Sequence, residues 1–75
     1  MCLSEVKRGQ SVSIVSIEEE HLRTQLIRLG ITEGSRIECL EKIPFGPCMI
    51  RHHRQEIALG RETAKRILVR KGGER

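Results

Sequence analysis

Residues 11–34, SVSIVSIEEEHLRTQLIRLGITEG, contain the change from strand to helix to turn on which the fold depends. In residues 11–17, Val12 and Ile14 alternate with serines. Such alternation of β-branched and polar residues predicts a strand with one buried face. The glutamates at 18–20 then place negative charge where the dipole of a helix favours it. The segment therefore predicts a strand followed closely by the start of a helix.

The helix predicted after these glutamates has its apolar residues on one stripe. Leu22, Leu26 and Leu29 recur at i, i+4 and i+7, which is the spacing of a single helix face. Gly30 should end the helix, because glycine adopts a left-handed conformation at little cost, and Ile31 can then fold back on the last turn. This is the best-defined helix that the sequence predicts.

On the N-terminal side of this segment, residues 3–9 predict one short helical turn. Ser4 can cap the turn, and the glycine at its end can stop it. Leu3 and Val6 would then point inward and plug the bottom of a barrel.

On the C-terminal side, the sequence predicts several short elements separated by turns. Three strands are expected at 36–42, 48–54 and 56–59, and Pro44-Phe45-Gly46-Pro47 forms the turn between the first two. A brief helical turn at 61–66, with Ala64 facing inward, and a closing strand at 67–70 complete the list.

Many short strands, tight turns and one inserted helix predict a mainly β fold, a small closed barrel of about five strands. Closure would remove the exposed strand edges of a short open sheet. With 75 residues, the chain is long enough for a single domain. We expect that domain to span residues 1–75, with its core in 3–70 and a flexible basic tail in 71–75.

Composition points to a cytoplasmic protein that does not insert into a membrane. The sequence has no run near the ~20 apolar residues that cross a bilayer. Its N-terminus lacks the positive start and apolar run of a secretion signal. Cys2, Cys39 and Cys48 are an odd set, too few for a disulfide framework, and reduced thiols are expected. Cys39 alternates with Ile37 and is expected to be a small buried residue.

The net charge of +4 has a location in the chain. Residues 1–59 carry eight basic and eight acidic residues, whereas residues 60–75 carry six basic and two acidic ones. A basic end of this kind is usually a solvated tail, but it can also meet nucleic acid, anionic lipid or an acidic protein face. Phe45 is the single aromatic residue of the sequence, which disfavours the base stacking used to bind single strands.

The sequence offers no catalytic constellation and no cofactor motif. Aspartate is absent, no glycine-rich phosphate loop follows a strand, and no serine or cysteine nucleophile can be placed beside a histidine. The consecutive glutamates at 18–20 would splay around a helix axis and cannot act as a paired acid and base. We therefore expect a protein that is not an enzyme and that has no cofactor.

Cys48, His52 and His53 are weak candidates for a metal site. On a strand, Cys48 and His52 share one face and His53 lies on the other, so the two histidines cannot easily hold one ion. Close cysteine or histidine spacings typical of zinc sites are absent. We favour a partly buried, hydrogen-bonded His52 and no resident metal, with metal contact by these residues, or a pH-sensitive docking role for His53, as alternatives.

Phe45 is the main candidate for binding a partner. An aromatic residue in a turn between two prolines is hard to bury and suits an interface anchor, although its ring could also fold back over the barrel mouth. Met49, Arg51 and His53 on the outward face of the next strand would extend that surface. Arg28 on the helix is a further candidate.

The order of these features resembles the ferrous iron transport protein A family, FeoA. The resemblance runs through Val6-Lys7-Arg8-Gly9, the leucine stripe with Gly30-Ile31-Thr32-Glu33-Gly34, Ile43-Pro44-Phe45-Gly46-Pro47, Ile57-Ala58-Leu59-Gly60 and Glu62 to Val69. It covers about residues 3 to 70. At the position of His52, members of the family usually have an apolar residue.

The resemblance implies an SH3-like barrel that assists a membrane ferrous iron transporter. Such a protein would dock onto the transporter's cytoplasmic GTP-binding part and support uptake of Fe(II), as a monomer or a weak homo-oligomer. Nucleic acid would not be its partner. The alternative function is a small SH3-like regulatory or nucleic-acid-binding module that uses its basic C-terminal end. Binding to phosphate backbones would weaken steeply as salt rises, whereas docking through Phe45 would largely persist.

Overall fold

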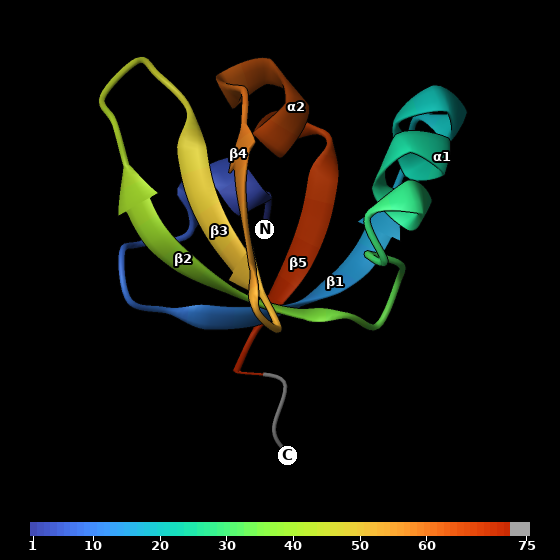
Figure 1. Ribbon diagram of the computed structural model, residues 1–75. Helices are drawn as coiled ribbons and strands as arrows, with labels where there is room; N and C mark the ends of the chain where they lie inside the picture. Colours follow the sequence, from blue (N-terminus) through green and yellow to red (C-terminus); the bar gives the residue numbers. More distant parts are fainter. Residues whose placement is uncertain (73–75) are drawn as a thin grey trace.

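Strand β1 (Ser11–Ile17) forms where the alternation of aliphatic residues and serines predicts it. In the computed structural model, which describes residues 1–72 (Figure 1), Val12, Ile14 and Ile17 of this strand are buried. Val12 and Ile14 occupy alternate positions, and the register shift between Ile14 and Ser16 in the pairing with β5 brings Ile17 to the same face. Each buried aliphatic side chain stabilises the fold by about 1.5–3 kcal/mol. The strand therefore lies with one face against the core.

The other strands pair with β1 or with one another in an antiparallel sheet. They are β2 (Arg36–Lys42), β3 (Cys48–His52), β4 (Gln55–Leu59) and β5 (Ile67–Lys71), and the order across the sheet is β4-β3-β2-β1-β5. The sheet curls around the core (Figure 1). The sequence predicted a closed barrel. Among the described residues, however, no ladder of hydrogen bonds joins β4 to β5, so the two edges of the sheet are not paired with each other.

Helix α1 (Glu20–Arg28) follows β1 as predicted, although it is shorter than the leucine stripe. Leu22 and Leu26 are buried, but Leu29 lies beyond the last helical residue and is 38% exposed. Gly30 has a φ of 82°, and the amide of buried Ile31 donates to the Leu26 carbonyl at 2.9 Å. The predicted stop is confirmed, and Leu29 lies at the C-cap, where it is more exposed than the other two leucines of the stripe.

Two further helical turns cover one end of the sheet, η1 (Leu3–Glu5) and α2 (Arg61–Lys65). Leu3 and Val6 are fully buried and Ala64 is 1% exposed, all as predicted. The N-cap of η1 is Cys2 and not Ser4: the Glu5 carboxylate accepts the Cys2 amide at 2.7 Å. Ser4 therefore lies within the turn that it was expected to cap.

The boundaries of β3 and β4 differ from the predicted ones by one or two residues. β3 ends at His52 and not at Arg54, because His53 adopts a left-handed φ of 57° and starts the turn to β4. β4 consequently begins at Gln55.

The C-terminal boundary of the core also differs from the prediction. Lys71 belongs to β5, and the amide of Gly72 donates to the Ser11 carbonyl at 3.1 Å. The ordered core thus extends beyond residue 70, and residues 73–75 of the predicted tail lie outside the described residues.

Every element contributes to a core made of aliphatic side chains and two cysteines, Cys39 and Cys48. All buried side-chain nitrogen and oxygen atoms in residues 1–72 have a hydrogen-bond partner. None of the helices that the structure describes combines the length and the apolar character needed to cross a membrane.

Candidate functional site

The loop between β2 and β3 is a tight turn that holds Phe45 at its tip. The Ile43 carbonyl accepts the Gly46 amide at 2.8 Å, and the Ile43 amide donates to the Pro47 carbonyl at 3.2 Å. Pro44 occupies the second position of this turn, where its fixed φ is favourable. Phe45 follows in the left-handed region with a φ of 61°, a place that usually requires glycine or asparagine.

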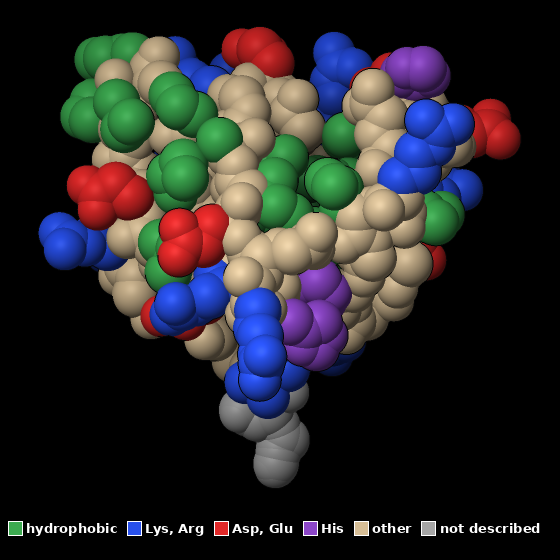
Figure 2. Space-filling view, viewed as in Figure 1, with side chains coloured by type: hydrophobic (Ala, Val, Ile, Leu, Met, Phe, Trp, Pro, Cys, Tyr) green, Lys and Arg blue, Asp and Glu red, His purple; other side chains and the backbone are tan. Residues whose placement is uncertain are grey.

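Phe45 is the most exposed large apolar residue that the structure describes. Its side chain is 87% exposed, and that of the neighbouring Ile43 is 49% exposed. Figure 2 shows hydrophobic side chains gathered at this end of the molecule, at the upper left of the view. The ring therefore does not fold back over the barrel mouth. It lies instead near the guanidinium carbon of Arg61, 5.4 Å from the ring centroid.

A pocket of about 420 Å³ lies beside this loop, between the loop, η1 and α2. Its lining combines apolar loop residues with two cations, Lys42 and Arg61, and includes no carboxylate. The Lys42 ammonium donates to the Ser4 carbonyl at 2.5 Å, which ties the loop base to η1. Pockets of this size can hold a large side chain or a small ligand.

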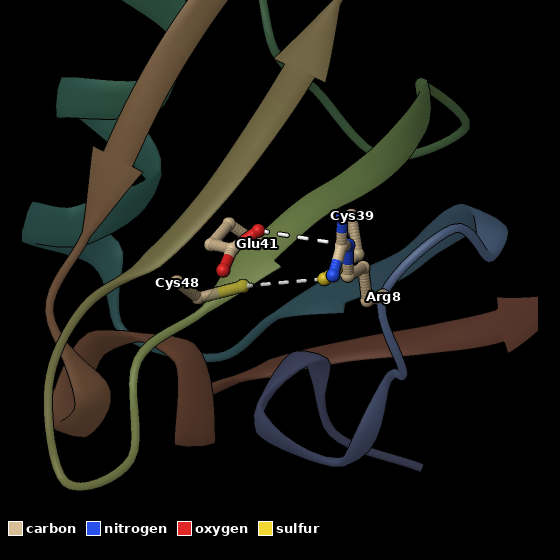
Figure 3. A network of polar contacts seen from close by, with 4 residues as sticks. All are labelled: Arg8, Cys39, Glu41 and Cys48. Carbon is tan, nitrogen blue, oxygen red and sulfur yellow. Dashed lines mark hydrogen bonds and ion pairs between the residues drawn. The ribbon is translucent and has the colours of Figure 1, made fainter.

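Cys48 lies at the base of the loop and faces Cys39 across the two strands (Figure 3). The two sulfur atoms are 4.0 Å apart, and both residues are buried. Burial, followed by the neighbouring Cys39, raises the pKa of Cys48 to about 11. Cys48 is thus a protonated thiol at neutral pH and a poor nucleophile. The exposed ion pair of Arg8 with Glu41, 3.6 Å long, lies nearby in the same view.

His52 lies at the opposite end of β3 and is buried, with 6% of its surface exposed. Its Nδ1 atom lies 3.2 Å from the Arg36 carbonyl oxygen, and its Nε2 atom lies 3.0 Å from the Gly30 carbonyl oxygen. Both ring nitrogens therefore contact the backbone, one on β2 and one just after α1. The predicted hydrogen bonding of His52 is confirmed, and the side chain is buried more completely than predicted.

The three weak metal candidates do not converge on one point. Cys48 and His52 share the buried face of β3, but they are four residues apart, or about 13 Å along a strand. His53 lies in the following turn and is exposed. Among residues 1–72, no three histidine, cysteine or glutamate side chains are grouped so that they could hold a metal ion.

The structure separates the predicted partner-binding residues into different regions. Phe45 lies in the loop before β3, whereas His53 lies in the turn after it, so the two are at opposite ends of the strand. Arg51 pairs with Glu38 at 2.9 Å. Met49 lies on β3 beside Glu41 of β2. Arg28 is in the last turn of α1. Phe45 and His53 are therefore separated by the whole length of β3.

Sequence reasoning missed Lys42 and Arg61 as neighbours of Phe45. Arg61 is distant from the loop in sequence and reaches it because α2 packs beside η1 at the loop end. No local pattern in the sequence carries that information.

The basic residues near the C-terminus are dispersed in the fold. Arg66 pairs with Glu19 at 2.6 Å, and Lys65 pairs with Glu62 at 3.4 Å. Arg61 lies over Phe45. The positive charge that is concentrated in the sequence is therefore partly neutralised by glutamates.

Comparison with known proteins gives one family. A model of the FeoA domain matches residues 1–71. No curated protein sequence matches the chain at a significant level.

Several solved structures share the fold. An iron uptake regulatory protein, FeoA, is 35% identical with a TM-score of 0.86, covering 95% of this chain and 96% of that one. FeoA of Stenotrophomonas maltophilia, complexed with zinc, is 27% identical with a TM-score of 0.79, covering 92% and 88%. It is described as an SH3 domain protein, which confirms the predicted SH3-like barrel. A manganese-dependent transcriptional repressor, 20% identical with a TM-score of 0.82, covers 95% of this chain and 41% of its own, and shows a shared fold alone.

Proposed function

The chain belongs to the FeoA family, and from this premise we propose that it is a cytoplasmic accessory protein of ferrous iron uptake. It docks onto the GTP-binding part of a membrane ferrous iron transporter. Docking would shift the populations of the transporter's states, because a protein that binds one conformation more tightly favours that conformation.

The observation that carries this proposal is the family match over residues 1–71, almost the whole described chain. The names of the relatives refer to iron uptake or ferrous iron transport. One is called an iron uptake regulatory protein, and the Stenotrophomonas protein is described as a candidate activating factor for ferrous iron transport.

The geometry supports a binding role through Phe45. An aromatic side chain that is 87% exposed lies at the tip of a loop whose backbone is fixed by two hydrogen bonds and two prolines. Rigid aromatic anchors of this kind supply much of the affinity in protein interfaces, because little conformational entropy is lost when they are buried.

The proposed function requires no resident metal in this chain. The Stenotrophomonas relative was solved with zinc. In this chain, both ring nitrogens of His52 already contact carbonyl oxygens, and Cys48 is too far along β3 to share an ion with it. Iron would then be the cargo of the transporter and not a ligand of the accessory protein.

The test is a binding measurement between the purified chain and the transporter's cytoplasmic GTP-binding domain. It should be made in the GDP state and with a non-hydrolysable GTP analogue. We expect binding in at least one state, and Phe45→Ala should weaken it about 30-fold, as for an anchor worth about 2 kcal/mol.

The matched control is Ile27→Ala, which removes a half-exposed aliphatic side chain from α1. Ile27 does not line the pocket at the loop, so its removal should leave the affinity unchanged. Absence of binding in every nucleotide state would contradict the proposed function.

A further inference from the structure

We propose that the pocket beside Phe45 recognises an acidic, apolar segment of its protein partner. One apolar side chain of the segment packs into the pocket against Phe45, and flanking carboxylates meet Lys42 and Arg61. This inference rests on the proposed function, because it assigns the chemistry of the docking partner at the same surface.

The first argument is the unfavourable conformation in which the fold presents Phe45. A φ of 61° costs a residue with a side chain about 1–2 kcal/mol, and glycine or asparagine would avoid that cost. An 87% exposed aromatic ring contributes little burial in return. A backbone outlier that brings an apolar side chain into water indicates a binding role more than a structural one.

The second argument is the shape of the surface next to the ring. The pocket of about 420 Å³ is bordered by Ile43, Pro44 and Pro47 on the loop and by Ala64 on α2. Its floor reaches Cys48, whose thiol is protonated and uncharged. Walls of this kind favour an apolar side chain, because its burial removes apolar area from water on both sides.

The third argument is the charge at the rim. Lys42 and Arg61 both line the pocket, and no carboxylate does. None of the ion pairs found in residues 1–72 includes Lys42 or Arg61. The Lys42 ammonium donates one of its three N–H groups to the Ser4 carbonyl, and the other two can meet a carboxylate. The guanidinium carbon of Arg61 lies 5.4 Å from the centroid of the Phe45 ring, and the N–H groups of a guanidinium can donate to a carboxylate that lies in the guanidinium plane.

Charge complementarity therefore selects the partner. A basic segment would place like charges against Lys42 and Arg61, and a purely apolar one would leave both cations without compensation. An anionic membrane also combines negative charge with apolar groups. Binding to anionic vesicles is therefore measured as a separate arm of the test.

The test uses the ¹⁵N-labelled full chain and three synthetic peptides of equal length. One alternates leucine with glutamate, one replaces glutamate by lysine, and one replaces leucine by serine. We expect the first peptide alone to shift the amide signals of residues 61–64 and of the non-proline residues in 42–48. The double variant Lys42→Glu/Arg61→Glu should weaken it at least about tenfold, since each exposed charge pair is worth up to about 1 kcal/mol and reversal adds repulsion.

The matched control is Arg54→Glu/Arg70→Glu, which changes the net charge equally at two exposed residues outside the pocket. It should bind the acidic, apolar peptide like the natural chain. Phe45→Ala should abolish the shifts caused by that peptide.

The outcomes separate this inference from the proposed function. If the transporter domain binds equally well to the Lys42→Glu/Arg61→Glu variant, the inference is wrong and the docking function stands. If the acidic, apolar peptide fails to bind the pocket, or if anionic vesicles bind through Phe45 and the peptide does not, the inference is also overturned. Peptide binding at the pocket without binding to the transporter domain would support the inference and contradict the proposed function.

Discussion

The two ends of strand β3 differ in the burial of their side chains, and in both cases burial is the opposite of what polarity predicts. At one end, polar His52 is buried and both ring nitrogens contact carbonyl oxygens of the backbone. At the other end, apolar Phe45 is 87% exposed and held in a left-handed conformation. The histidine joins elements of the fold, whereas the phenylalanine contributes little to the fold. His52, whose ring could bind a metal or a proton, therefore has a structural role. Phe45, which has no reactive group, is the better candidate for function.

The largest expected effect comes from breaking the buried end with His52→Leu. This change would remove the ring N–H that donates to the Gly30 or the Arg36 carbonyl, depending on the tautomer. We expect the free energy of unfolding to fall by about 1–3 kcal/mol, because an unsatisfied buried group costs about that much. Urea unfolding followed by circular dichroism measures the difference.

The control for this change is His53→Asn, next in the chain, at an exposed site where asparagine tolerates the left-handed φ of 57°. Its stability should stay within about 0.5 kcal/mol of the natural chain. Equal losses in the two variants would show that His52 has no special structural role.

At the exposed end, Phe45→Asn should separate stability from binding. Asparagine accepts the left-handed conformation, so the free energy of unfolding should stay unchanged or rise by up to about 1 kcal/mol. Affinity for the transporter domain should nevertheless drop about 30-fold, as for loss of an interface anchor. Urea unfolding and calorimetric titration of one preparation give both numbers. A clear loss of stability would mean that Phe45 supports the fold after all.

Raising the pH should lower the stability of the fold by ionising Cys48, which is buried where the exposed loop meets β3. The folded chain raises the pKa of Cys48 from 9.0 to about 11, chiefly through burial. The folded state therefore keeps this proton to a higher pH than the unfolded chain does. The resulting stabilisation is complete below about pH 9 and disappears as the pH rises towards 11.

Urea midpoints measured across this pH range should fall for the natural chain and fall less for Cys48→Val, which has no thiol to ionise. Cys2→Ala, which keeps both buried cysteines, should behave like the natural chain. If Cys48→Val and the natural chain lose stability in parallel, the ionisation of Cys48 is not the cause.

The smallest expected effect concerns metal. Because Cys48, His52 and His53 are separated along β3 and its following turn, a chelator should leave the thermal midpoint unchanged. Elemental analysis of protein prepared without an affinity tag or chelator should find far less than one iron or zinc per chain. A stoichiometric metal would contradict this expectation and would require ligands other than these three.

Much of the fold could be predicted because its signals are local. The alternation in residues 11–17, the leucines of α1 and Gly30 each act within a few residues. Errors arose where one residue decides a boundary. His53 ends β3 through its φ of 57°, and the sequence gives no strong sign that a histidine rather than a glycine adopts that conformation.

The candidate site could be predicted only in part because its contacts are not local. The proline-flanked turn singled out Phe45. The placement of Arg61 over its ring depends on the return of the chain through β4 and α2. The predicted extension through Arg51 and His53 followed the face of a strand but ignored its length, which carries His53 to the other end of the sheet.

The pairing of β5 with β1 has a consequence for how the chain folds. Ile67 to Lys71 lie beside Ile17 to Val12, so the last described strand completes a ladder begun by the first. A loop of about fifty residues must close before those hydrogen bonds form, and such distant pairings slow folding. We therefore expect folding in milliseconds to seconds, as in other small barrels. During synthesis, β1 could pair with β5 only after β5 had left the ribosome.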